Sequence, residues 1–155
     1  MTNLSTNRSQ RAKEYFLSGY NCAQSVVLAF ADKTGLDKDI LLKIASPFGG
    51  GMGRLREVCG CVSGMNIILG IVCGYNINND KDKKKQLYQR VQELAKKFEK
   101  KNGSIVCREL LNLKQKSDIP VPQERTNEYY KKRPCPELVE SAAEILENFL
   151  NENNL

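Results

Sequence analysis

Residues 80–101 read DKDKKKQLYQRVQELAKKFEKK, and the spacing of the apolar residues in this stretch indicates the fold class. They recur at intervals of four, three and four, as Leu87, Val91, Leu94 and Phe98. This is the period of an amphipathic α-helix that buries one face. Asn102 and Gly103 follow, and both residue types commonly end helices. We therefore expect one long helix here, with its charged face turned to solvent.

The sequence on either side also shows helical patterns, and none of the alternation typical of strands. We expect helices over residues 9–18, 21–35, 38–45, 55–73, 104–111 and from 134 to near the C-terminus. Residues 112–133 show no period and contain Pro120 and Pro122, which predicts a long irregular loop near 112–133. The predicted fold is all-α, a compact single-domain bundle of about six to seven helices.

The length and composition of the chain fit a single helical domain over residues 1–155, with residues 1–8 as a frayed N-terminal tail. The N-terminus is polar and lacks the apolar core of a secretory signal. The most apolar stretch, residues 58–73, is shorter than the ~20 residues that a membrane span needs. We expect a cytoplasmic protein that does not insert into membranes and that forms a homodimer.

The formal net charge is +6, from 24 Lys and Arg against 18 Asp and Glu. Much of the excess lies in residues 80–101, which carry nine basic and four acidic side chains. A basic surface attracts phosphates. No helix-turn-helix, zinc-finger or aromatic-interleaved pattern accompanies the charge, however, so we interpret it as a solvated helix face and expect no nucleic-acid partner.

Cysteine and histidine usage limits the chemistry of the chain. There is no histidine, which excludes Ser-His-Asp and Cys-His nucleophile systems, as well as zinc sites with histidine ligands. In a reducing compartment the six cysteines are not expected to form a structural disulfide framework. Catalysis, redox exchange and metal binding are the remaining roles for the cysteines. The six are Cys22, Cys59, Cys61, Cys73, Cys107 and Cys135.

Four of these cysteines fall at or near the predicted starts of helices. They are Cys22, Cys59, Cys107 and Cys135. Backbone N–H groups at a helix start are unpaired and the helix dipole is positive there, so the thiolate form is favoured. A thiolate serves both as a nucleophile and as a metal ligand. The alternative interpretation is that each cysteine packs as a small apolar side chain.

The other two cysteines are expected to be packing residues. Cys61 follows Cys59 by two positions, hence about 200° around a helix, so the two should not face one site. Cys73 lies fourteen residues beyond Cys59, or ~21 Å along a helix axis.

A glycine-rich stretch precedes Cys59. It comprises Gly49, Gly50, Gly51 and Gly53, followed by Arg54 and Arg56. Consecutive backbone N–H groups and two guanidinium groups can bind an anion, which makes the stretch a candidate anion or substrate loop. The alternative, which we favour, is a tight passage beneath a neighbouring helix.

Several of these features together resemble a known family. Residues 19–23 (GYNCA), 48–53 (FGGGMG) and 59–64 (CGCVSG), with Cys107 and Cys135, resemble the C_GCAxxG_C_C family. The resemblance spans roughly residues 11–149, and Cys22, Cys59, Cys107 and Cys135 match the four characteristic cysteines. Cys61 stands where the family motif CGAxxG has alanine. The resemblance implies redox activity that depends on the four matched cysteines.

Three functional hypotheses follow. The first is a cytoplasmic thiol-redox protein that needs no cofactor, in which Cys59 or Cys22 is the nucleophile and a second cysteine resolves the mixed disulfide. Arg54 or Arg56 would stabilise the thiolate. The substrate would be a redox partner protein, a small disulfide or another electron acceptor.

The second hypothesis is an iron–sulfur cluster or a zinc ion bound by the same four cysteines, Cys22, Cys59, Cys107 and Cys135. The third is a non-catalytic helical protein that binds a partner through its long loop and basic helix, while the thiols only pack. The sequence does not separate the three.

Overall fold

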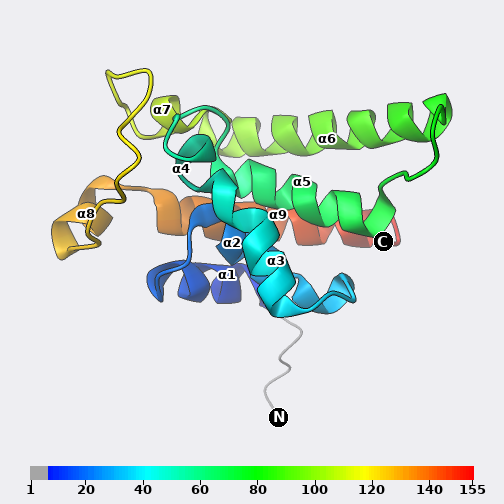
Figure 1. The fold of residues 1–155 in the computed structure, drawn as a ribbon, viewed down its shortest axis with the longest axis horizontal. Coiled ribbons are helices and arrows are strands. Elements are labelled where there is room, and N and C mark those ends of the chain that lie inside the picture. The colour runs from blue at the N-terminus through cyan, green and yellow to red at the C-terminus, as the bar shows by residue number, and fades with distance from the viewer. Residues whose placement is uncertain (1–6) are drawn as a thin grey trace, which may run out of the picture.

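The computed structural model describes residues 7–155 and confirms the all-α class (Figure 1). Those residues contain no strand, only an isolated antiparallel bridge between Val58 and Val106. The helices are α1 (Arg8–Leu17), α2 (Cys22–Ala29), α3 (Lys38–Ala45), α4 (Gly49–Met52), α5 (Gly60–Cys73), α6 (Lys81–Asn102), α7 (Cys107–Leu110), α8 (Asn127–Lys132) and α9 (Cys135–Glu152). Short 3-10 turns occupy Ala31–Lys33 and Ser46–Phe48.

Helix α2 lies at the centre of the fold because it is apolar nearly all round. It packs against α1, α3, α5 and α9, and its residues from Ser25 to Ala29 are all buried. A capping box fixes its start: Asn21 accepts a hydrogen bond from the Gln24 backbone N–H, and the Gln24 side chain accepts one from the Asn21 N–H. The position of Cys22, the first residue of α2, follows from this cap.

The remaining long helices enclose α2. Figure 1 shows α6 running along α5 at one edge of the molecule and α1 at the opposite edge, with α9 between them. The predicted apolar stripe of α6 is confirmed, since Leu94 and Phe98 are fully buried and Leu87 and Val91 pack against the core. Helix α9 contributes a long buried face and contacts α1, α2, α5 and α6.

The prediction that residues 1–8 form a frayed tail is wrong for residues 7 and 8. Residues 1–6 lie outside the described residues, but Asn7 caps α1 and Arg8 begins it. Arg8 is buried and forms ion pairs with Asp32 and Glu147, with its Nη2 2.8 Å from Asp32 Oδ2 and its Nε 3.3 Å from Glu147 Oε1. A buried charge is retained only when it is paired, and these carboxylates pair Arg8.

Several predicted boundaries also change. Helix α2 ends at Ala29 and a 3-10 turn continues it, whereas we expected it to reach Gly35. Helix α5 starts at Gly60 and not near residue 55, because the residues before it adopt left-handed conformations. Residues 112–126 are irregular as predicted, but α8 follows, capped by the Thr126 hydroxyl, which accepts a hydrogen bond from the Tyr129 N–H.

None of the helices in residues 7–155 combines the length and the apolar composition that crossing a bilayer requires.

Helices α2 and α5 pack closely at Gly64, so a substitution at this position tests the fold directly. A methyl group on Gly64 would lie 3.0 Å from both the Ala23 carbonyl oxygen and the Val26 Cβ, whereas one on Gly70 of the same helix would meet open space. We expect Gly64→Ala to lower the free energy of unfolding by about 1–3 kcal/mol through overpacking. Gly70→Ala should leave it unchanged or raise it by up to about 1 kcal/mol. Urea denaturation of the two variants checks this, and equal effects would contradict the packing.

Candidate functional site

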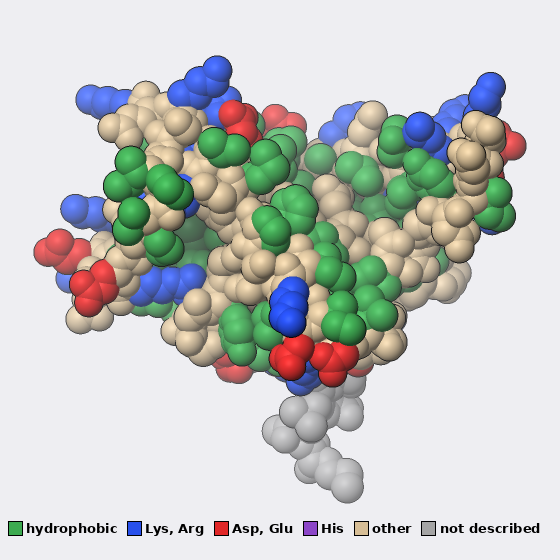
Figure 2. All heavy atoms as spheres, in the orientation of Figure 1, with side chains coloured by type: hydrophobic (Ala, Val, Ile, Leu, Met, Phe, Trp, Pro, Cys, Tyr) green, Lys and Arg blue, Asp and Glu red, His purple; other side chains and the backbone are tan. Residues whose placement is uncertain are grey.

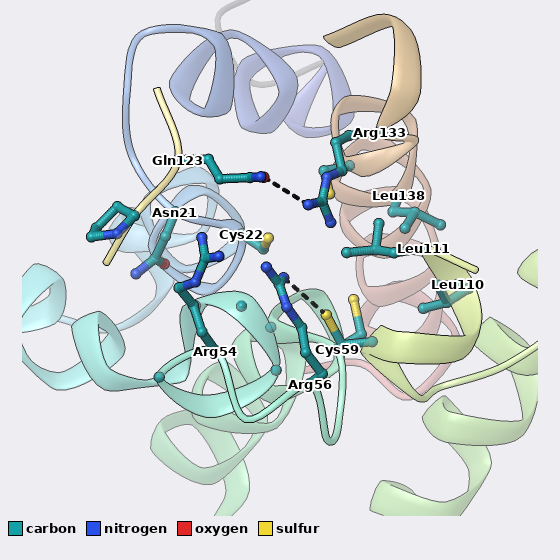
Figure 3. Close-up of a pocket in the computed structure, with 18 of the residues that line it drawn as sticks. Asn21, Cys22, Arg54, Arg56, Cys59, Leu110, Leu111, Gln123, Arg133 and Leu138 are labelled. Carbon is teal, nitrogen blue, oxygen red and sulfur yellow. Dashed lines mark hydrogen bonds between the residues drawn. The ribbon is translucent and has the colours of Figure 1, made fainter. Parts of the chain in front are cut away.

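A cavity of about 360 Å³ opens where the first residues of four helices meet. Figure 2 shows the hollow beside the segment of residues 112–126, and Figure 3 shows its lining. The lining includes the four predicted site cysteines, Cys22, Cys59, Cys107 and Cys135. It also includes the predicted loop residues Gly49, Gly50, Gly51, Gly53, Arg54 and Arg56. The fold therefore brings the whole predicted set together.

The expected placement of the four cysteines at helix starts is confirmed. Cys22, Cys107 and Cys135 are the first residues of α2, α7 and α9, and Cys59 is the N-cap of α5. Helix α7 is capped by Val106 and not, as expected, by Ser104, which moves Cys107 to the first position of the helix.

The isolated bridge between Val58 and Val106 places two of the cysteines next to each other. The Cys59 N–H donates to the Ile105 carbonyl oxygen at 2.8 Å, and the Cys107 N–H donates to the Glu57 carbonyl oxygen at 2.6 Å. These two hydrogen bonds fasten the start of α5 to the start of α7. The sequence offers no strand pattern from which this pairing could be predicted.

The Cys22 thiol interacts with two other cysteines. Cys135 and then Cys61 lower its pKa through hydrogen bonding, the Gly50 backbone N–H lowers it further, and the charge of Arg125 acts in the same direction. Together these groups hold the pKa of Cys22 well below its ordinary value despite burial. Cys22 is also the one of the four that is partly exposed, while Cys59, Cys107 and Cys135 are buried.

The prediction that a helix start favours the thiolate does not hold for Cys107 and Cys135. The hydrogen bond that Cys135 donates to Cys22, followed by burial, raises the pKa of Cys135. Burial raises the pKa of Cys107 as well, although Arg56, whose Nη1 lies 3.6 Å from Cys107 Sγ, opposes the rise. The interaction with neighbouring thiols and the loss of water outweigh the helix dipole at these two positions.

Cys61 is a buried packing residue that does not line the cavity, as predicted, but it interacts with Cys59, which the expected rotation of about 200° does not allow. Cys59 is an N-cap with non-helical backbone angles (φ −51°, ψ 133°), so the rotation of 100° per residue does not apply to it. Cys61 is fully buried behind the cavity and forms thiol hydrogen bonds with both Cys22 and Cys59. Burial and the Cys22 contact raise its pKa. Cys73, at the far end of α5, is outside the cavity, and its thiol donates to the Leu69 carbonyl oxygen at 3.2 Å.

The glycine-rich stretch forms a left-handed turn. The φ angle is positive at five consecutive residues, 50–54, including the non-glycines Met52 and Arg54. A left-handed conformation costs a residue with a side chain roughly 1–2 kcal/mol, and strain of this kind is concentrated at functional sites. A methyl group on Gly51 would lie 2.6 Å from Cys107 Cβ. The turn is thus tightly packed, in agreement with the interpretation of this stretch as a tight passage. Its Gly50 N–H also lowers the pKa of Cys22.

Two further arginines line the cavity, and the sequence analysis missed both: Arg125 and Arg133. Arg133 comes two residues before Cys135, so its proximity to the site could have been inferred once Cys135 was selected. Arg125 lies in an irregular segment, and no sequence pattern indicates its position. Arg54 and Arg56 share the Asp118 carboxylate, at 2.8 and 3.2 Å.

Metal binding was the alternative role for the cysteines. Across residues 7–155 no three Cys, Asp or Glu side chains are already arranged as ligands around one point.

The fold and the site define an all-α protein whose thiols gather at helix N-termini around one cavity. The family described as putative redox-active protein (C_GCAxxG_C_C) matches residues 20–149, and the chain belongs to this family. No curated protein and no solved structure matches the chain.

The hydrogen bonds to Cys22 predict the pH dependence of its alkylation. Because the pKa of Cys22 is lowered, its reaction with iodoacetamide should stay fast as pH falls below about 8.5, the ordinary thiol pKa, and should slow only as pH passes the lowered value. Cys135→Ala removes one donor and should move this profile to higher pH. Peptide mass spectrometry after brief alkylation at pH 6–9 measures it. Faster labelling of Cys107 than of Cys22 at neutral pH would contradict the assignment.

Proposed function

We propose that the protein reduces disulfides by thiol–disulfide exchange, with Cys22 as the nucleophile and Cys135 as the resolving cysteine. The observation that carries this proposal is that Cys22, the partly exposed cysteine of the four, lines the cavity beside Cys135, and that Cys135, Cys61 and the Gly50 N–H lower its pKa. A thiolate stabilised in this way is the reactive form in disulfide exchange. Membership of a redox family agrees with this chemistry.

The reaction has two steps. The Cys22 thiolate attacks one sulfur of the substrate disulfide, the substrate S–S bond breaks, and a mixed disulfide and one substrate thiolate form. The Cys135 thiol then loses its proton to water or to the departing thiolate and attacks the Cys22 sulfur. The second substrate thiolate leaves, so the substrate gains two electrons and the protein is left with a Cys22–Cys135 disulfide. A thiol reductant, such as a dithiol protein or a small thiol of the cytoplasm, returns the protein to its reduced form.

Cys135 is the better resolving cysteine for two reasons. It lines the cavity, whereas Cys61 does not, so a sulfur bound to Cys22 in the cavity is within its reach. It is also the largest cause of the lowered pKa of Cys22, so the two thiols interact before the reaction. Cys61, fully buried between Cys22 and Cys59, serves as a second donor that holds the Cys22 thiolate in place.

Single substitutions separate these roles. Cys22→Ser should reduce the rate of disulfide reduction to that of the buffer alone, because the nucleophile is gone. Cys135→Ser should react once and stop at a mixed disulfide on Cys22, visible as an added mass. Cys73→Ser is the matched control and should behave as the wild type, since Cys73 lies outside the cavity. Full turnover in both Cys22→Ser and Cys135→Ser would disprove the mechanism.

The convergence of four cysteines on one cavity keeps a metal or iron–sulfur site as the second candidate. It requires the thiols to rearrange around the metal, and it predicts colour or tightly bound metal in protein purified without oxygen. Stoichiometric iron or zinc that is lost in the Cys22→Ser variant would favour this candidate. Colourless, metal-free protein that reduces disulfides would favour exchange.

A further inference from the structure

The cavity around Cys22 carries an excess of positive charge. Four guanidinium groups line it, from Arg54, Arg56, Arg125 and Arg133, and no carboxylate does. Asp118, from the segment of residues 112–126, pairs with both Arg54 and Arg56 and balances one of their two positive charges. Even with a Cys22 thiolate present, the groups around the cavity retain net positive charge.

Arg125 and Arg133 have only neutral partners. The Arg125 guanidinium donates to the carbonyl oxygens of Phe16 and Tyr20, and Arg133 Nη2 donates to Gln123 Oε1 at 2.7 Å. Neither of them forms an ion pair with a carboxylate anywhere in residues 7–155. Arg133 therefore has guanidinium N–H groups available for a ligand. In the view of Figure 3, the Cys22 sulfur projects between Arg133 on one side and Arg54 and Arg56 on the other.

A buried polar atom in the lining is also unsatisfied. The Arg56 side chain is only 6% exposed, and its Nε has no hydrogen-bond partner. Leaving such a donor unpaired in the interior costs roughly 1–3 kcal/mol, more for a charged group. The guanidinium of Arg56 therefore keeps an unpaired buried donor at the cavity wall.

Much of the rest of the lining is apolar. Phe16, Leu110, Leu111, Tyr129 and Leu138 contribute to the walls, and the volume of about 360 Å³ is that of a small-molecule site. Such a volume admits a compact organic molecule and excludes a folded protein segment. Apolar walls with a few convergent polar groups are the ordinary form of a specific small-molecule pocket.

We propose that this cavity binds a small disulfide bearing a carboxylate or similar anionic group, which Arg133 holds near the charge of Arg125 while the S–S bond meets Cys22. This inference rests on the proposed exchange function and specifies its substrate class. Guanidinium groups pair with carboxylates through paired N–H donors, and they do so most strongly where water is excluded. The apolar body of the substrate would lie against the leucines of α7 and α9.

Two aromatic disulfides test the inference. Dithiobis(nitrobenzoate) carries a carboxylate on each ring, and dithiodipyridine is neutral at pH 7. With reduced full-length protein, Cys22 attacks either one, one aromatic thiolate leaves, and Cys135 displaces the second with loss of its proton. The released chromophore gives the rate constant of the first step for each disulfide, and the ratio of the two rate constants is compared between variants so that their intrinsic reactivities cancel.

Arg133→Gln should lower the rate constant for the dianionic disulfide about tenfold relative to that for the neutral one, which corresponds to about 1.4 kcal/mol. Arg133→Lys should recover part of this preference because it keeps the charge. Lys132→Gln removes the same charge one residue away, on an exposed side chain outside the cavity, and should leave the ratio unchanged. These three results together support the anionic substrate.

The contrary outcomes are distinct. If Arg133→Gln leaves the ratio of the dianionic to the neutral rate constant unchanged, the anionic substrate class is wrong. The same holds if Lys132→Gln lowers this ratio equally. Neither result would contradict the exchange function. A wild-type protein whose Cys22 reacts with neither disulfide would instead overturn the exchange function itself. Circular dichroism of each variant verifies that the helices are retained.

Discussion

The structure depends on bringing the N-terminal ends of α2, α5, α7 and α9 to one cavity. Helix starts carry unpaired N–H groups and partial positive charge, so their convergence is unfavourable unless a group with negative charge lies among them. Cys22 lies among these helix starts, and its neighbours Cys135 and Cys61 and the Gly50 N–H lower its pKa. The pKa values of Cys61, Cys107 and Cys135 are raised, so the negative charge is favoured on Cys22. In the function proposed above, the geometry that satisfies the helix ends also makes Cys22 the reactive thiol.

Small residues make this convergence sterically feasible. Gly60 and Gly64 let α5 approach α2, since a methyl group on Gly60 would lie 2.8 Å from the Phe48 carbonyl oxygen and 3.1 Å from Cys22 Cβ. The left-handed turn of residues 50–54 brings Gly51 against Cys107 and aims the Gly50 N–H at Cys22. The family motif around Cys59 and the glycine-rich stretch thus have the same structural role, because their glycines allow the backbone to come within contact distance of cysteine side chains.

Much of the fold and site could be predicted from the sequence, because local signals agree there with tertiary structure. The apolar stripe of α6, the Asn21 cap and the Pro136 that follows Cys135 located their helices, and proximity to predicted helix starts selected the four cysteines, although the expected starts near Cys59 and Cys107 were displaced by a few residues. The burial of Cys61 was expected, but its interaction with Cys59 could not be predicted, because it depends on Cys59 being an N-cap rather than a helical residue. Likewise, Arg125 reaches the cavity through contacts with Phe16 and Tyr20, more than a hundred residues away in the chain, which no local pattern reports.

In the proposed function, Cys22 and Cys135 form the reacting pair within a cluster of five cysteines. The most direct measurement is the identification, by peptide mass spectrometry, of the disulfide that forms when the reduced protein receives one equivalent of oxidant. The account predicts a Cys22–Cys135 linkage as the main product, with Cys59, Cys61 and Cys107 still alkylatable after unfolding. A main product that links Cys59 to Cys107, or that leaves Cys22 reduced, would contradict it.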